Sequence, residues 1–260
     1  MDSTADILDA RGLRTREDTL RKYFGVGADT KLLDSPAMLP SLTPAITDHL
    51  DSVNLEWHVI PSARVAPFDD RYCRRLYPTA PAPFHSWLSD GHSVRDRLAY
   101  GHRSHQGRLV AIESTMKPGY LPDAQQAYGS KHGFETTSDP LLRYMDHTSL
   151  AGTTRYGHKF LGLGGFVDAL TNNWRRLALL PQGYRVTLCP PVLFNLIGTL
   201  FHPEWSQTAS LEVGFYWESP GSARCYAVGP NGDGDFSYVR PIEIGFDWRM
   251  LGFRIALIPE

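Results

Sequence analysis

Cysteine is scarce in this sequence, and its spacing excludes several classes of protein. The chain contains only Cys73, Cys189 and Cys225. An odd number of widely separated cysteines provides neither a disulfide framework nor a C-x-x-C zinc knuckle. Reduced thiols are typical of the cytosol. The sequence therefore predicts a cytoplasmic protein with three reduced cysteines.

Long apolar runs are also missing. A membrane-spanning helix needs ~18 or more apolar residues. The longest run here, Val192 to Phe201, is interrupted by Asn195, Gly198 and Thr199. The acidic start of the chain has no apolar segment of the kind found in a signal peptide. We expect no association with a membrane.

Neither sign of charge dominates. The chain has 26 basic and 28 acidic residues, so it lacks the positive field that attracts nucleic acid or an anionic membrane. We therefore expect no nucleic-acid partner. Hydrophobic residues make up 42% of the 260 residues, which is ordinary for a globular protein of one large domain or two small ones.

Several segments have the signals of helices. Leu20, Tyr23 and Phe24 follow a possible cap at Thr15, and Gly25 ends that pattern. Further helices are expected from Thr43-Pro44 onward, over 165–180 with Phe166, Ala169, Leu170, Trp174 and Leu177 on one face, and from Pro190-Pro191 to Phe201.

Alternating apolar residues predict strands at 55–60, 109–112, 184–189, 211–218, 223–228, 238–244 and 251–258. Together these patterns indicate an α+β fold: a loop-rich body with helices packed on a twisted antiparallel sheet. The composition changes near residue 53. We therefore expect an N-terminal helical segment at 1–52, followed by a domain at 53–260.

Short motifs in the last 100 residues resemble a known family. A helix with Asp168-Ala169 and Asn173-Trp174 leads to a turn at 181–187, and the chain closes with Leu251-Gly252-Phe253-Arg254-Ile255-Ala256-Leu257. This pattern resembles the formylglycine-generating-enzyme-like (sulfatase-modifying-factor) branch of the C-type lectin fold. The resemblance implies a C-type-lectin-like scaffold for residues 53–260.

The resemblance does not extend to the family's chemistry. Leu193-Phe194 stands where the family has an acidic-aromatic pair. No cysteines match the paired copper ligands of its catalytic members. The resemblance therefore implies a ligand-binding or other use of the scaffold, not formylglycine synthesis.

His102 and His105 form an H-x-x-H pair, which places both imidazoles on one face of a helix. With a third ligand such a pair holds a divalent metal. His58 and Glu113, on the flanking strands, are candidates for that ligand. The alternative is a polar loop with exposed histidines.

A second candidate for metal binding is a possible calcium loop. Asn231, Asp233 and Asp235 place three oxygen side chains at alternate positions, as calcium loops do. The alternative is a glycine-rich hairpin turn, because N-G and D-G are strong turn formers.

The C-terminal half contains two other candidate sites. Tyr216, Glu218 and Arg254 are candidates for contact with a ligand, although aromatics at this spacing are more often core and cross-strand pairs. Cys189 precedes a helix and is either a nucleophile, with His158 or His202 as base, or a small buried residue.

Three functions remain open from the sequence. The first is a soluble C-type-lectin-like protein that binds a small ligand or a protein partner through long loops at 61–105 and 115–157. The second is a metal-dependent enzyme using His102 and His105. The third is a structural subunit of a larger assembly. The sequence does not decide whether the protein is an enzyme or what cofactor it uses.

Overall fold

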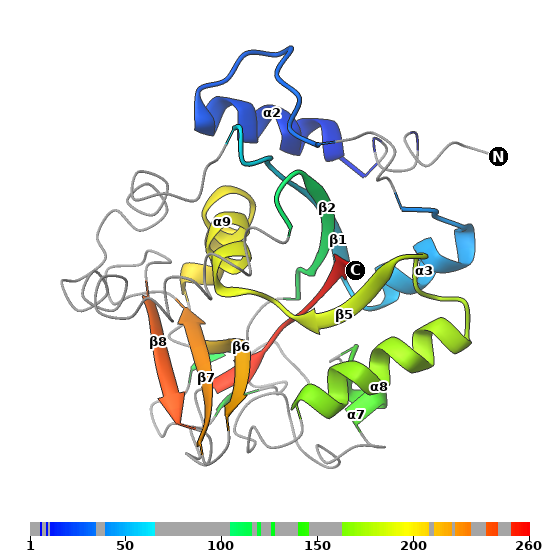
Figure 1. Ribbon diagram of the computed structural model, residues 1–260, viewed down its shortest axis with the longest axis vertical. Coiled ribbons are helices and arrows are strands. Elements are labelled where there is room, and N and C mark those ends of the chain that lie inside the picture. The colour runs from blue at the N-terminus through cyan, green and yellow to red at the C-terminus, as the bar shows by residue number, and fades with distance from the viewer. Residues whose placement is uncertain are drawn as a thin grey trace.

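A computed structural model describes residues 6, 9, 11–34, 40–65, 105–115, 119–120, 126–127, 140–145, 163–207, 211–219, 222–229, 238–243 and 251–260. The fold is α+β, as predicted (Figure 1). The helices are α2 (Leu13–Phe24), α3 (Pro44–Ser52), α7 (Leu142–Met145), α8 (Leu163–Arg176), α9 (Pro191–Phe201) and the 3₁₀ helix η4 (Pro203–Gln207).

The strands form two larger sheets and one short pair. The first sheet has the order β1-β2-β10-β5 and is antiparallel; its strands are β1 (Leu55–Ile60), β2 (Arg108–Glu113), β5 (Tyr184–Leu188) and β10 (Ile255–Pro259). The second sheet has the order β8-β7-β6-β9; its strands are β6 (Leu211–Ser219), β7 (Ser222–Gly229), β8 (Tyr238–Glu243) and β9 (Leu251–Phe253). The short pair is β3 (Gly119–Tyr120) with β4 (Gln126–Ala127).

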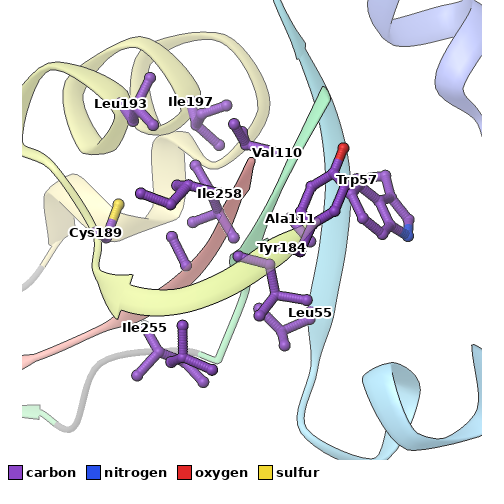
Figure 2. Packing of buried hydrophobic residues seen from close by; sticks show 14 of the residues in the cluster. Leu55, Trp57, Val110, Ala111, Tyr184, Cys189, Leu193, Ile197, Ile255 and Ile258 are labelled. Carbon is purple, nitrogen blue, oxygen red and sulfur yellow. The ribbon is translucent and has the colours of Figure 1, made fainter. Parts of the chain in front are cut away.

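Helices cover both faces of the first sheet. Trp57 on β1 packs edge-to-face against Tyr184 of β5 on one face, where Thr171 of α8 also bonds the backbone of Val186. On the other face, Leu193 and Ile197 of α9 lie beside Val110, Ile258 and their neighbours (Figure 2). A sheet covered on both sides buries nearly all of its side chains, which explains the continuous apolar runs of β2 and β10.

Capping residues visible in the sequence mark the ends of α2 and α3. Thr43 caps α3 by accepting a hydrogen bond from the Ile46 amide, as predicted, and Pro44 is its first residue. Gly25 ends α2 in a left-handed conformation. That helix begins at Leu13 after Gly12, two residues before the expected cap at Thr15.

Two expectations about the C-terminal half were wrong. Helix α8 ends at Arg176, because Ala178 has a φ of 54°, and Leu177 is 49% exposed rather than part of the apolar face. Ala169 is also exposed. The strand expected at 251–258 divides at Arg254: β9 pairs in parallel with β6, while β10 enters the first sheet between β2 and β5.

The N-terminal helices pack on the first sheet. Both α2 and α3 contact β1, the first strand after the expected boundary near residue 53. The division into 1–52 and 53–260 stays a prediction. Within the described ranges, no helix is long and apolar enough to cross a membrane. Cys189 is buried, with Sγ 3.8 Å from the Pro190 carbonyl oxygen, which fits a small core residue.

One close backbone approach yields a stability prediction. Gly107 has a φ of 70°, and a Cβ there would lie 2.1 Å from Asp34 Oδ2. We expect Gly107→Ala to lower the free energy of unfolding by about 2 kcal/mol, from left-handed strain plus displacement of Asp34. Gly183→Ala is the control, because Gly183 has a φ of 75° but no neighbour within 4 Å. Urea denaturation of both variants compares them; equal losses would show that Asp34 moves aside without cost.

Candidate metal centre

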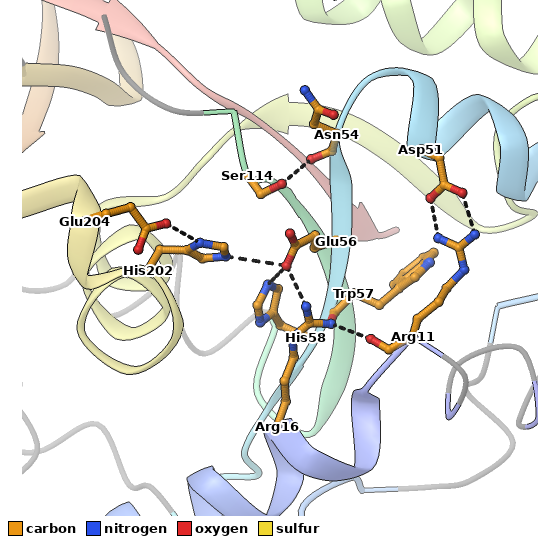
Figure 3. Close-up of polar contacts among 10 residues, drawn as sticks. All are labelled: Arg11, Arg16, Asp51, Asn54, Glu56, Trp57, His58, Ser114, His202 and Glu204. Carbon is orange, nitrogen blue, oxygen red and sulfur yellow. Dashed lines mark hydrogen bonds and ion pairs between the residues drawn. The ribbon is translucent and has the colours of Figure 1, made fainter. Parts of the chain in front are cut away.

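Three potential metal ligands converge beside β1 (Figure 3). Glu56 and His58 lie two residues apart on this strand and therefore point to the same face. His202 immediately follows α9. Glu56 Oε2 lies 3.4 Å from His202 Nε2 and 3.9 Å from His58 Nε2. One ligand atom from each of the three side chains falls within 4.8 Å of the others.

The end of α9 holds His202 in place. The His202 amide still donates to the carbonyls of Ile197 and Gly198, but its backbone has left the helical conformation, with a φ of −135° and a ψ of 58°, so the helix ends here. The imidazole stacks on Trp205, with ring centroids 4.5 Å apart and an angle of 5° between the rings. Its Nδ1 lies 2.9 Å from Glu204 Oε1, so Nε2 is the nitrogen that faces Glu56.

His58 is the most buried member of the cluster. It is 1% exposed and packs against Phe201, with ring centroids 5.2 Å apart. Neither of its ring nitrogens has a hydrogen-bond partner within the described part of the chain. Burial, and after it the charge of Arg16, hold the pKa of His58 well below its usual value. His58 is therefore neutral at pH 7, the form that binds metals.

Glu56 carries the negative charge of the cluster. Its Oε2 accepts a hydrogen bond of 2.6 Å from Arg16 Nη2. The interaction with His202 and the charge of Arg16 lower the pKa of the Glu56 carboxyl to about 2, against the opposing effect of burial. Arg16 Nη1 also donates to the carbonyls of Arg11 and Trp57, each at 3.1 Å, which fixes α2 against β1.

This donor set suits a divalent transition metal. Two imidazole nitrogens and one carboxylate oxygen are typical ligands of zinc and its neighbours. With bonds of about 2.0–2.2 Å, tetrahedral ligand atoms lie roughly 3.3–3.6 Å apart. The separations of 3.4 and 3.9 Å are close to this range. The carboxylate of Glu204 on Nδ1 of His202 is the usual outer partner of a metal-binding histidine.

A metal-free interpretation explains less of the geometry. Without a metal, His202 Nδ1 pairs with Glu204, but His202 Nε2 is buried with no hydrogen-bond partner within the described residues. The two nitrogens of His58 are likewise buried without partners there. Buried polar atoms are nearly always paired, and exceptions often mark an ion or another bound group.

The described structure brings only one member of the predicted histidine site to this cluster. His58 belongs to it. Glu113 pairs across the sheet with Leu55, so its side chain lies on the opposite face from His58, and its Oε2 accepts from the Ile255 amide at 3.2 Å. His105 is buried in the turn before β2, at the far end of the strand from Glu113. His102 lies outside the described residues.

Arg254, a predicted ligand-binding residue, is 3% exposed. Its Nη1 donates to the backbone carbonyls of Glu113 and Thr115, and its guanidinium lies 3.9 Å above the Trp205 ring. The alternating pattern of the last strands predicts a carboxylate on a neighbouring strand as its partner, with Glu212, Glu218 and Glu243 as candidates. The break between β9 and β10 instead turns Arg254 toward the end of β2.

The other candidate site residues are only partly placed. Tyr216 and Glu218 lie on β6, where they pair with Cys225 and Ala223 of β7. Asn231, Asp233 and Asp235 of the possible calcium loop lie outside the described residues, as do most of the expected binding loops at 61–105 and 115–157. These expectations stay predictions.

Sequence reasoning missed two of the three candidate ligands. Glu56 carried a usable signal, because a Glu-x-His pair on a strand places both side chains on one face. His202 was considered only as a base for Cys189. No spacing rule connects it to β1, because the two segments meet only through the packing of α9 on the sheet.

Comparison with known proteins adds no relative. No protein-family model matches the chain, and no curated protein or solved structure matches it either. The cluster is therefore the basis for proposing a function.

The role of Glu204 can be tested apart from the ligands. Removal of an outer carboxylate typically costs about 10- to 100-fold in metal affinity. We expect Glu204→Ala to weaken Co²⁺ binding within that range, with Glu204→Gln affected less because an amide oxygen still accepts from His202 Nδ1. Equilibrium dialysis measures both, and unchanged affinity in Glu204→Ala would show that Glu204 does not orient the ligand.

Proposed function

We propose that the protein is a metal-dependent enzyme whose divalent transition metal is held by Glu56, His58 and His202. The observation that carries this proposal is the buried His58. Both of its nitrogens lack partners within the described structure, and its Nε2 points at the carboxylate oxygen that also faces His202. A cation shared by these atoms gives His58 its missing partner.

Three protein ligands fit a catalytic rather than a purely structural metal. Structural zinc sites usually have four protein ligands, whereas catalytic sites have three and leave a position for water or substrate. A metal held by these residues would lower the pKa of a bound water, to ~7 in the best zinc sites, and so would supply a nucleophile. The Glu56 side chain is 31% exposed, so solvent reaches the cluster. Hydrolysis or hydration of a small substrate is the reaction class that this arrangement supports.

Metal titration tests the proposal. Protein freed of metal with a chelator should bind one Co²⁺ or Zn²⁺ per chain, and the visible absorption of Co²⁺ should indicate tetrahedral coordination. His58→Gln and His202→Ala should each lower the affinity at least tenfold, by analogy with the losses seen even for outer-shell changes. His49→Gln is the matched control, because His49 is also buried, at 7% exposure, but lies outside the cluster.

The outcomes separate this site from the one predicted from sequence. The proposal fails if the wild type binds no stoichiometric metal, or if His58→Gln binds it as tightly as the wild type. If His102→Ala/His105→Ala lost the metal and His58→Gln kept it, the metal site would be the H-x-x-H pair instead. The lectin-like binding function remains a separate proposal that rests on the sequence motifs alone.

A further inference from the structure

A cavity of about 320 Å³ adjoins the metal cluster. Glu56 and Arg16 line the cavity, whereas His58 and His202 do not. The cavity therefore borders the cluster at Glu56. Its other lining residues are Arg11, Asp51, Asn54, Leu55, Trp57 and Ser114. The volume lies near the lower end of the ~300–1,000 Å³ range of small-molecule sites, and the lining is mostly polar.

We infer that this cavity binds a small carboxylate-bearing substrate, with Arg11 as the residue that receives the carboxylate. The inference rests on the proposed metal function, because the metal supplies the charge that favours an anion there.

Arg11 already presents its guanidinium to a carboxylate. Its two terminal nitrogens bond the two oxygens of Asp51, the Nη2 bond being 2.5 Å long (Figure 3). This forked geometry is the one in which arginine recognises carboxylates. The side chains of Arg11 and Asp51 are 29% and 50% exposed. An exposed pair of this kind contributes only ~0–1 kcal/mol, so a ligand carboxylate can replace Asp51 at small cost.

The charge of a metal-loaded cluster favours an anion. Without metal, Arg11 and Arg16 face the carboxylates of Asp51 and Glu56. Glu204 adds one more negative charge, on the far side of His202. Asp48 also acts electrostatically on Arg11. A divalent cation adds two positive charges beside Glu56, so the wall of the cavity near Arg16 is more positive with the metal than without it, and a carboxylate in the cavity is favoured by that added charge.

The added charge predicts that binding of the metal and binding of the carboxylate are coupled. If the metal improves carboxylate binding, the carboxylate must improve metal binding by the same factor. Coupling free energies between sites typically correspond to ~5- to 150-fold. We expect a simple carboxylate to tighten Co²⁺ binding at least fivefold.

The experiment measures the Co²⁺ dissociation constant by titration in the presence of acetate or of acetamide, its neutral analogue, at matched ionic strength. The proteins are the wild type, Arg11→Gln and Arg14→Gln. Arg14 is the control because it lies only three residues after Arg11, in the first turn of α2, with its side chain 76% exposed; it pairs with Asp9 and does not line the cavity. Acetate should tighten Co²⁺ binding in the wild type and Arg14→Gln, and the effect should fall below twofold in Arg11→Gln.

Each result distinguishes this inference from the proposed function. If Co²⁺ binds but acetate and acetamide act alike, the carboxylate site is wrong and the metal site stands. If acetate acts equally in Arg11→Gln, it binds the metal alone and Arg11 is not its receptor. If no Co²⁺ binds at all, the proposed function fails and this inference falls with it.

Discussion

A chain lacking residues 255–260 is expected to have no cooperative unfolding transition. These residues contain β10, which lies between β2 and β5 and pairs with both. Ile255, Leu257 and Ile258 are at most 3% exposed. Burying each such side chain contributes about 1.5–3 kcal/mol, and the whole net stability of a domain is only ~5–15 kcal/mol. Removing the strand also leaves the hydrogen-bonding edges of two neighbours unpaired.

Circular dichroism of the purified truncated protein during heating tests this expectation. The control removes only Glu260, whose side chain is 48% exposed and pairs with Arg175 at the surface. The control should melt within a few degrees of the full chain, because exposed ion pairs contribute little. A cooperative transition in the longer truncation, near that of the full chain, would show that β10 is not an essential strand of the first sheet.

Arg254→Ala is expected to lower the free energy of unfolding by about 3–5 kcal/mol. Arg254 donates to the carbonyls of Glu113 and Thr115 and covers the ring of Trp205. Each carbonyl left without a donor costs roughly 1–3 kcal/mol, and the lost contact with the indole adds about 0.5–2 kcal/mol. Guanidinium denaturation at pH 7 measures the change.

Arg185→Ala is the control for this substitution. Arg185 lies on β5 in the same sheet but its side chain is exposed. We expect a change within about 0.5 kcal/mol, the usual range for surface positions. If Arg254→Ala lowered the free energy of unfolding no more than Arg185→Ala does, the contacts of Arg254 would not stabilise the fold.

Local sequence signals predicted the elements of the fold well. Thr43-Pro44 marked the start of α3, and alternation marked β1, because both effects act over a few neighbouring residues. Helix α9 was found from its apolar run after Pro190-Pro191. These patterns depend on short-range geometry and are visible without knowledge of the tertiary structure.

Features that depend on long-range packing were not predictable in this way. The division of the last strand at Arg254 places β9 and β10 in different sheets, although the apolar run continues through both. The candidate site is formed by β1 and by the end of α9, which are far apart in the sequence. His58 was identified as a candidate ligand, but His202 is brought to it only by the packing of α9 on the sheet.

The most direct test of the metal centre is a crystal grown with Zn²⁺ and measured at the zinc absorption edge. We expect an anomalous difference peak about 2.0–2.2 Å from Glu56 Oε2, His58 Nε2 and His202 Nε2, with a further position open toward solvent. If the map shows no peak among these three side chains, although the protein was saturated with zinc in solution, the metal centre is not there.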